Sequence, residues 1–425
     1  MDRAEGAKAI NLINRGLGRV PVQFISTIFV ALTLLIACGG RVLACPFCRP
    51  VKTTFTEDIN AADVAVLGEL VSRPQRPDTN EGEIPAADII DSYKTTFKIQ
   101  KVYRGDARVN PGDEIVAIYT GDAPIGTNCL LRGIGEEELQ WTPPIPLSAR
   151  AQEYVEKVLE LPESGAGRLN FFEDYLEDED ATLRGDAFDE FARADYQALK
   201  DISAQIDRPR LLRWIQNPEV TPSNRRLYFT MLSVCGTEAD GQLLREMIVS
   251  GDPAQLKGLD SLVSCYLTLR GADGIPLIEN QFLRGGVFWD PEYVHTYAAI
   301  MAIRFQGQEG DIIPKERLIE ALRIVLDRPE LADLVIPDLA RWKDWGSMDR
   351  LIQMFKSAGK KSSWVRVPIV NFLRACPLPK AKEELEQLAK IDPDAVRRAT
   401  TFFPFAPGNR EKKTEKGSDS AGQKK

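Results

Sequence analysis

The stretch Leu176–Phe191, LEDEDATLRGDAFDEF, decides the fold of most of the chain. A run of carboxylates precedes a basic residue, Arg184, and apolar residues at helical spacing follow. A carboxylate at the start of a helix caps its free N–H groups, so this order predicts a loop followed by a capped helix. Later segments repeat the order, with a polar or proline-containing loop before each of these apolar runs: Leu227–Val234, Leu259–Leu267, Tyr297–Phe305, Leu334–Trp342 and Val367–Leu373.

The repeats have irregular spacing. The equivalent positions, which lie 42, 31, 38, 37 and 34 residues apart, are Arg184, Arg226, Lys257, His295, Ala332 and Arg366. A second helix is expected in each repeat, at Gly241–Val249, Ile275–Leu283, Glu316–Leu326, Met348–Ala358 and Ala381–Ile391. The pattern resembles HEAT repeats, and the resemblance implies an all-α solenoid over residues 148–404. Pro337 and Pro368 are expected inside first helices, where each should produce a kink.

The region from 45 to 147 has a different pattern. Val64–Val71 is a continuous apolar run typical of a buried strand, and Thr95, Phe97 and Ile99 alternate with polar residues. Further strands are expected at Glu114–Thr120 and Cys129–Ile134. No segment is long enough for a crossover helix, so these strands predict a small antiparallel β-barrel. The fold class is therefore multidomain α+β, a β-barrel followed by an all-α region.

The barrel region resembles a known family. The residues that carry the resemblance are a Cys at the expected mature start, Ala61-Ala62-Asp63-Val64 leading into a strand with Gly68, the segment Phe97–Gly105, and Cys129. They are similar to the netrin-like OB-fold barrel, also found in the tissue inhibitors of metalloproteinases, that occurs in secreted bacterial proteins. That family usually begins Cys-x-Cys, whereas this chain has Cys45-Pro46-Phe47-Cys48. The resemblance implies that a free Cys45 amine and carbonyl could chelate the metal of a protease. The whole pattern also resembles secreted proteins of unknown function from planctomycete bacteria.

Residues 1–44 have the layout of a secretory signal. Basic residues up to Arg19 precede an apolar run at Phe24–Ala37, and small residues permit cleavage after Ala44. A retained membrane anchor and a lipid on Cys38, which follows Leu35-Ile36-Ala37, are the alternatives. All three predict an extracytoplasmic body, and the last two would attach it to a membrane. The tail at 405–425 is polar and is expected to be disordered.

Composition excludes several functions. Residues 45–404 carry 43 basic and 57 acidic residues, a net charge of −14 that disfavours nucleic-acid binding. The single histidine, His295, excludes a multi-histidine zinc site, and its equivalence to basic repeat residues indicates a helix-surface or interface role. The sequence has no nucleophile elbow, phosphate loop or metal-ligand cluster. We therefore expect no enzyme activity, no cofactor and no metal.

The pair Cys45 and Cys48 is the one motif that could carry chemistry. A Cys-x-x-Cys pair at a helix start can exchange disulfides, but here the signal segment occupies the place of the preceding strand. The alternative is a structural bridge among Cys45, Cys48 and Cys129. The leading interpretation is a non-enzymatic scaffold that binds a protein partner through its solenoid surface. Thiol-disulfide exchange or thiol-dependent regulation is the second.

Other residues have ordinary interpretations. The acidic run Glu173–Asp180 lacks the central glycine of a calcium loop and is expected to be solvated carboxylates at a helix end. Small buried cysteines are expected to close first helices, at Cys235, Cys265 and Cys376. The three tryptophans Trp342, Trp345 and Trp364 are expected in the core or on a ridge. Any of them that is exposed on the concave face of the solenoid would be a binding anchor.

Overall fold

The computed structural model describes residues 51–73, 92–285, 293–359 and 362–402. The chain divides into two units, Met1–Ala44 and Cys45–Lys425, and every described residue belongs to the second. The predictions for the signal segment, for Cys38, Cys45 and Cys48, and for the tail at 405–425 lie outside the described residues.

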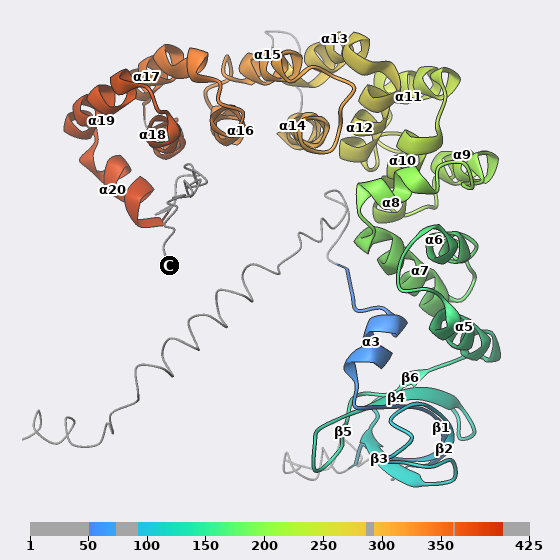
Figure 1. Cartoon of the computed structure of the whole chain (residues 1–425). Coiled ribbons are helices and arrows are strands. Elements are labelled where there is room, and N and C mark those ends of the chain that lie inside the picture. The colour runs from blue at the N-terminus through green and yellow to red at the C-terminus, as the bar shows by residue number, and fades with distance from the viewer. Residues whose placement is uncertain (1–50, 74–91, 286–292, 360–361, 403–425) are drawn as a thin grey trace, which may run out of the picture. The chain divides into compact units, whose positions relative to one another are not determined.

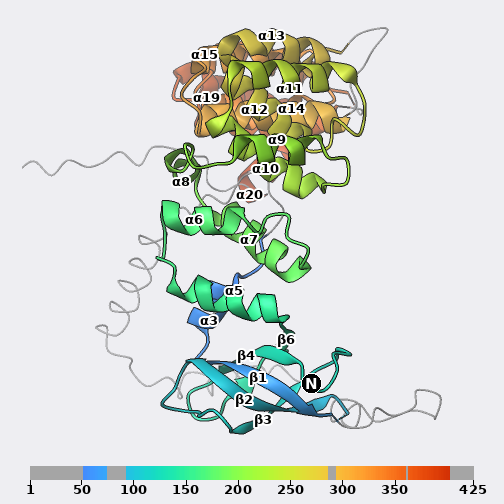
Figure 2. The same cartoon turned by 90° about the vertical axis from the view of Figure 1, so that its right-hand side faces the viewer.

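An antiparallel sheet follows the short helix α3 (Phe55–Ala61) and curls into a nearly closed barrel (Figures 1 and 2). Its strands are β1 (Val64–Ser72), β2 (Lys94–Arg104), β3 (Glu114–Ile118), β4 (Asn128–Ile134), β5 (Gln140–Trp141) and β6 (Ile145–Pro146). Their order is β3-β2-β1-β4-β5, with β6 also paired to β4, and the end strands β3 and β5 contact each other. The predicted barrel is confirmed. Strands β5 and β6 are too short to give a sequence pattern.

Strand β1 is buried on both faces. Val64, Val66 and Leu70 point into the barrel. Ala65 and Leu67 belong instead to the hydrophobic core of the helical region. This is why the run VAVLGELV is continuously apolar rather than alternating. The barrel and the helices therefore share a hydrophobic core across one wall of the barrel.

Helices occupy the rest of the described chain. The first four are α5 (Ala149–Glu160), α6 (Ala166–Glu173), α7 (Ala181–Arg193) and α8 (Tyr196–Asp201). Two rows follow (Figure 1). The odd row contains α9 (Arg208–Gln216), α11 (Glu238–Ser250), α13 (Ile275–Ile278), α15 (Lys315–Val325), α17 (Met348–Ser357) and α19 (Pro379–Ile391). The even row contains α10 (Pro222–Cys235), α12 (Leu259–Arg270), α14 (Tyr293–Gln308), α16 (Ile336–Arg341), α18 (Arg366–Ala375) and α20 (Pro393–Phe402).

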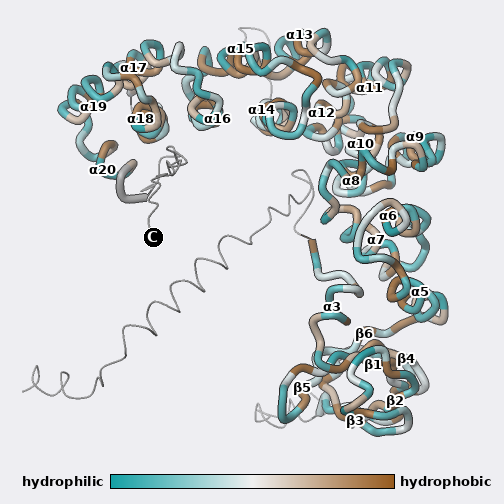
Figure 3. Tube along the Cα trace, in the orientation of Figure 1, coloured by the Kyte–Doolittle hydropathy of each residue, from teal (hydrophilic) through white to brown (hydrophobic). Residues whose placement is uncertain are grey.

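The predicted helix pairs are confirmed. The five expected first helices correspond to α10, α12, α14, α16 and α18, and the expected second helices lie in the odd row. A π-helical turn, Glu279–Leu283, extends α13 to the predicted end. Hydrophobic and hydrophilic stretches alternate along the helices (Figure 3), and the buried hydrophobic residues of the helices form one continuous core. Each helix thus buries its apolar stripe against the other row and against its neighbours.

The prediction for the two prolines is wrong. Pro337 lies at the start of α16, directly after the 3-10 turn Ala332–Leu334. Pro368 lies in the first turn of α18, which also follows a 3-10 turn, Ser363–Val365. The first turn of a helix has no intrahelical partner for its N–H groups, so proline costs nothing there. Each proline therefore begins a helix rather than kinking one.

Arginine–carboxylate pairs connect successive helices within a row. Arg226 on α10 binds Asp260 on α12 at 2.8 Å, and Arg304 on α14 binds Asp338 on α16 at 2.6 Å. In the odd row, Arg208 on α9 binds Asp240 on α11 at 2.5 Å. Each of these arginines reaches forward to the next helix of its row.

Candidate functional site

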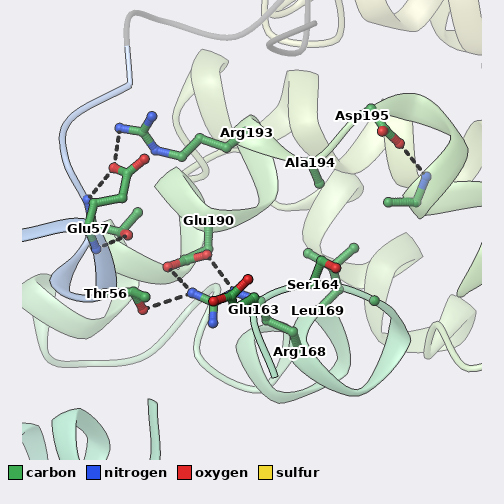
Figure 4. Close-up of a pocket in the computed structure, with 13 residues that line it drawn as sticks. Thr56, Glu57, Glu163, Ser164, Arg168, Leu169, Glu190, Arg193, Ala194 and Asp195 are labelled. Carbon is green, nitrogen blue, oxygen red and sulfur yellow. Dashed lines mark hydrogen bonds and ion pairs between the residues drawn. The ribbon is translucent and has the colours of Figure 1, made fainter. Parts of the chain in front are cut away.

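A cavity of about 350 Å³ lies where α3 meets α6 and α7 (Figure 4). Its charged lining joins α3 to a part of the helical region more than 100 residues away. Glu57 belongs to α3, Arg168 to α6, and Glu190 and Arg193 to α7; Glu163 and Asp195, which precede α6 and α8, add two further carboxylates.

Helix α3 is positioned by its own cap. Thr54 accepts a hydrogen bond from the Glu57 backbone at 3.4 Å, and the Glu57 carboxylate accepts one from the Thr54 backbone at 3.1 Å. This reciprocal capping box satisfies two N–H groups that a short helix leaves free. Phe55 and Ile59 are buried on the opposite side, so the Glu57 side chain is turned toward the cavity.

The floor of the cavity is a buried ion pair. The Arg168 guanidinium binds the Glu190 carboxylate through two bonds, Nε to Oε2 at 3.1 Å and Nη2 to Oε1 at 2.6 Å. Nη2 also donates to the Thr56 hydroxyl at 2.8 Å, which ties α6 to α3. Both side chains of the pair are under one tenth exposed. A buried charge that loses its partner is costly, so this pair fixes the position of α6 against α7.

A second pair lies at the rim. Arg193 binds the Glu57 carboxylate at 2.9 Å and also donates to the backbone carbonyl of Lys52. Both side chains are partly exposed, so water screens this pair more than the Arg168–Glu190 pair. The rim pair therefore contributes orientation more than stability.

Beside the cavity, Asp186 joins α3 to the helices. Its carboxylate accepts the Phe55 N–H at 2.7 Å and the Tyr154 hydroxyl at 2.7 Å. Burial raises the pKa of Asp186 to about 7, and the nearby Glu190 and Asp189 add to the rise. Burial also raises the pKa of Tyr154. The Tyr154 hydroxyl is therefore a hydrogen-bond donor and not a base.

The charged groups of the cavity are used mainly in ion pairs between α3 and the helices α6 and α7. Each of the two arginines that line it is already bonded to a carboxylate. Among its described lining residues there is no cysteine or histidine, and the hydroxyls are those of Thr54, Thr56 and Ser164. The arrangement holds the segment before the barrel against the helices, and it presents no activated nucleophile.

Of the predicted cysteine site, the structure describes Cys129 alone. Cys129 is a free, fully buried thiol on β4, inside the barrel. Burial raises its pKa to about 11, which disfavours the reactive thiolate. Its predicted bridge to Cys45 or Cys48 stays a prediction.

The other cysteines are free thiols in the helical region. Cys235 ends α10 and Cys376 caps α18, as predicted. Cys265 lies in the middle of α12 and not at its end. Cys265 and Cys376 are buried, whereas Cys235 is partly exposed.

The acidic run before α7 is more structured than the sequence indicated. Asp180 caps α7, accepting the Thr182 N–H at 2.9 Å, which agrees with the predicted helix-end role. Asp178 is buried, however, and binds Arg150 at 2.5 Å. Glu173 is also buried and binds Arg210 at 3.0 Å. The prediction of solvated carboxylates is therefore wrong for these two, because arginines from other helices compensate their burial.

The predicted tryptophans lie at different depths. Trp342 and Trp345 are partly buried and pack against the helical core. Trp364 is 46% exposed. His295 is partly buried on α14 and packs against Phe282, with ring centroids 6.2 Å apart. This contact agrees with the predicted interface role.

A pair of exposed tyrosines was missed. Tyr293 and Tyr297, on the first turns of α14, stack with centroids 6.1 Å apart and planes 9° apart. They are 55% and 41% exposed, and Val294 beside them is 58% exposed. Their i,i+4 spacing was a signal for a shared helix face, but the apolar run to Phe305 predicts burial equally well.

Within the described ranges, no group of three or more histidine, cysteine or acidic side chains could hold a metal ion. No helix in the same part of the chain is long and apolar enough to cross a membrane. No protein-family model, curated protein or solved structure matches the chain.

Proposed function

We propose that the chain is an extracytoplasmic scaffold without enzyme activity that binds a protein partner through the even row of its helices. The netrin-like character of the barrel and the HEAT-like character of the helix pairs are part of this proposal. So is export, which rests on the signal-like layout of residues 1–44. The stacked pair Tyr293 and Tyr297 is the observation that carries the proposal.

The tyrosine pair is suited to binding because it is rigid as well as exposed. Stacking restricts both rings, and Tyr297 also contacts the Arg304 guanidinium. Arg304 is in turn held by Asp338, which is fully buried. A partner would therefore meet aromatic surface whose side-chain entropy is already restricted.

Tyrosine is also the residue type that interfaces favour. It offers a large apolar ring with a polar hydroxyl, and aromatic residues are enriched at the centres of protein interfaces. Val294 extends the apolar surface beside the pair. We call Tyr293, Val294 and Tyr297 the α14 patch.

Site-specific crosslinking tests the proposal. A photo-crosslinking amino acid is placed at Tyr293 in the organism that makes the protein, and the matched control places it at Ile391 of α19, which is 49% exposed. We expect one discrete protein adduct from position 293 and not from 391. The purified partner should then bind the wild-type chain at least about tenfold more tightly than Tyr293→Ser/Tyr297→Ser. Equal adducts from both positions, or none, would refute the scaffold.

Thiol-disulfide exchange through Cys45-Pro46-Phe47-Cys48 stays the alternative. Both thiols lie outside the described residues, and no contact of the described chain favours this chemistry. It predicts turnover of a disulfide substrate that is lost in Cys45→Ser. The scaffold predicts that Cys45→Ser leaves crosslinking from position 293 unchanged.

A further inference from the structure

The α14 patch continues along its helix to a group of charged side chains. Tyr293, Tyr297, Met301 and Arg304 fall at i, i+4, i+8 and i+11, so they share one face of α14. The two tyrosine rings stack, and Tyr297 contacts the Arg304 guanidinium. Arg304 Nη1 lies 3.0 Å from the Met301 sulfur. One face of α14 therefore joins exposed aromatic surface to a cation.

Two arginines share one buried carboxylate at the end of this face. Arg304 holds Asp338 with Nε at 2.9 Å from Oδ1 and Nη2 at 2.6 Å from Oδ2. Arg341 of α16 donates from Nη1 to the same Oδ1 at 2.6 Å. Because both guanidinium groups bond one oxygen atom, they lie side by side. Asp338 is fully buried, and the three side chains together carry one excess positive charge.

Arg341 is the member of this group that a partner can reach. Its side chain is 50% exposed, whereas that of Arg304 is 23% exposed. Among the described residues, its bond to Asp338 is made by Nη1, which leaves Nε and Nη2 to bind a ligand. These two nitrogens form one edge of the planar guanidinium, and that edge matches the two oxygens of a carboxylate.

No acidic side chain of α14 or α16 is free to neutralise this charge. Helix α14 contains no acidic residue, and the one in α16 is Asp338. The carboxylate of Asp333, in the 3-10 turn before α16, accepts N–H groups of its own turn. Asp290 and Glu292, which precede α14, lie outside the described residues. Residues 45–404 carry a net charge of −14, but salt screens charges more than about 8–10 Å away, so the local charge governs a contact.

The spacing along α14 sets the shape of the partner segment. Tyr297 and Arg304 are seven residues apart, which is about 10 Å along a helix. An extended peptide covers that distance in about three residues. A segment with an apolar side chain on the tyrosines and a carboxylate about three residues away therefore reaches both ends of the surface.

We propose that the partner segment bound at the α14 patch is acidic, and that one of its carboxylates pairs with Arg341 while an apolar side chain packs on Tyr293 and Tyr297. This inference rests on the proposed function, because it names the chemistry of the partner at the same site. A basic segment would meet the excess charge of Arg304 and Arg341, which selects against it.

Random peptides displayed on phage are the probe. They are selected in parallel on the immobilised full chain, on Arg341→Gln and on the control Arg350→Gln. Arg350 lies on α17 in the odd row and is 39% exposed, so both changes remove one exposed charge. Arg341→Gln is expected to fold, because Arg304 still compensates Asp338.

The composition of the selected peptides gives the first result. We expect peptides from the wild type and from Arg350→Gln to combine aspartate or glutamate with apolar residues, and peptides from Arg341→Gln to lack the acidic excess. No enriched peptide, or the same acidic content in all three selections, would overturn the proposal.

Fluorescence anisotropy with one selected peptide then measures the ion pair itself. Arg341→Gln should weaken binding at least about tenfold relative to Arg350→Gln, since a charge-assisted hydrogen bond is lost. Replacing the acidic residue of the peptide by its amide should weaken binding to the wild type by a similar factor and leave binding to Arg341→Gln unchanged. Equal effects of the amide peptide on both proteins would overturn the proposed pair.

Tyr293→Ser/Tyr297→Ser separates this inference from the proposed function. Loss of peptide binding in this variant but not in Arg341→Gln would overturn the acidic partner and keep the α14 patch. Wild-type affinity in the tyrosine variant would show that the peptide binds elsewhere, and the acidic partner would again be overturned. The crosslink from position 293 reports on the scaffold in either case.

Discussion

Replacing Asp186 by asparagine should remove a pH-dependent destabilisation of the folded state. Asparagine keeps the shape of the side chain. Its Oδ1 can accept the Phe55 N–H, and its amide can donate to the Tyr154 oxygen, so both 2.7 Å contacts of the carboxylate have a counterpart. The substitution removes only the charge that burial penalises.

The raised pKa of Asp186 determines whether its contribution to stability grows or falls as the pH rises. The unfolded chain releases the Asp186 proton near pH 4, whereas the folded chain keeps it until about pH 7. Between these values the folded state binds more protons, so the contribution of Asp186 to stability is present below about pH 4 and is lost as the pH rises to 7. The rise of about three pKa units corresponds to a loss on the order of 4 kcal/mol.

Urea unfolding at a series of pH values from 5 to 8 measures this effect. Groups distant from Asp186 are the same in both proteins, so the difference in unfolding free energy between Asp186→Asn and the wild type reports on Asp186 and the carboxylates beside it. That difference should shift in favour of the variant by about 1.4 kcal/mol per pH unit between pH 5 and 7 and then level off. The control, Asp349→Asn, changes an exposed carboxylate and should give a constant difference. A constant difference for Asp186→Asn as well would refute the reasoning.

Three further predictions concern the packing and the thiols. Arg168→Met should lower the unfolding free energy by about 3–5 kcal/mol, because Glu190 is left buried and unpaired. The double variant Arg168→Met/Glu190→Gln should recover part of this loss. Equal stability of the single and double variants in urea unfolding would contradict the prediction. Gly68→Ala places a Cβ 2.6 Å from the Leu131 side chain and should lower the unfolding free energy by about 1–3 kcal/mol. Gly185 lies in a helix, and a Cβ there meets nothing within 4 Å, so Gly185→Ala should raise the melting temperature. Native alkylation at pH 8, followed by mass spectrometry, should leave Cys129 unlabelled, because its pKa is about 11 and it is buried. Labelling of Cys129 after denaturation without reductant would exclude its predicted bridge, and rapid native labelling would contradict its burial.

The helices could be predicted because their signal is local. Apolar residues at helical spacing located α10, α11 and α12 to within a few residues, since each helix buries one stripe whatever its partner is. The inter-helix ion pairs could not be predicted, because Arg226 and Asp260 are 34 residues apart and nothing local couples them. The repeat spacing predicts the order of the helices, but not which residue of one helix reaches the next.

The contacts between α3 and the helices were even harder to predict from the sequence. Phe55 and Asp186 are 131 residues apart, and Thr56 and Arg168 are 112 apart. Only the folded chain brings them together.

A local signal for this connection was nevertheless present in the stretch that decided the fold. Core residues Leu183, Ala187 and Phe191 mark one face of α7, and Asp186 and Glu190 fall at the i+3 and i+7 positions of the same face. Two carboxylates on an apolar helix face must be either neutral or compensated. The structure shows both solutions, a raised pKa at Asp186 and a bidentate arginine at Glu190. A charged residue in an apolar stripe therefore indicates a long-range contact, although it does not identify the partner.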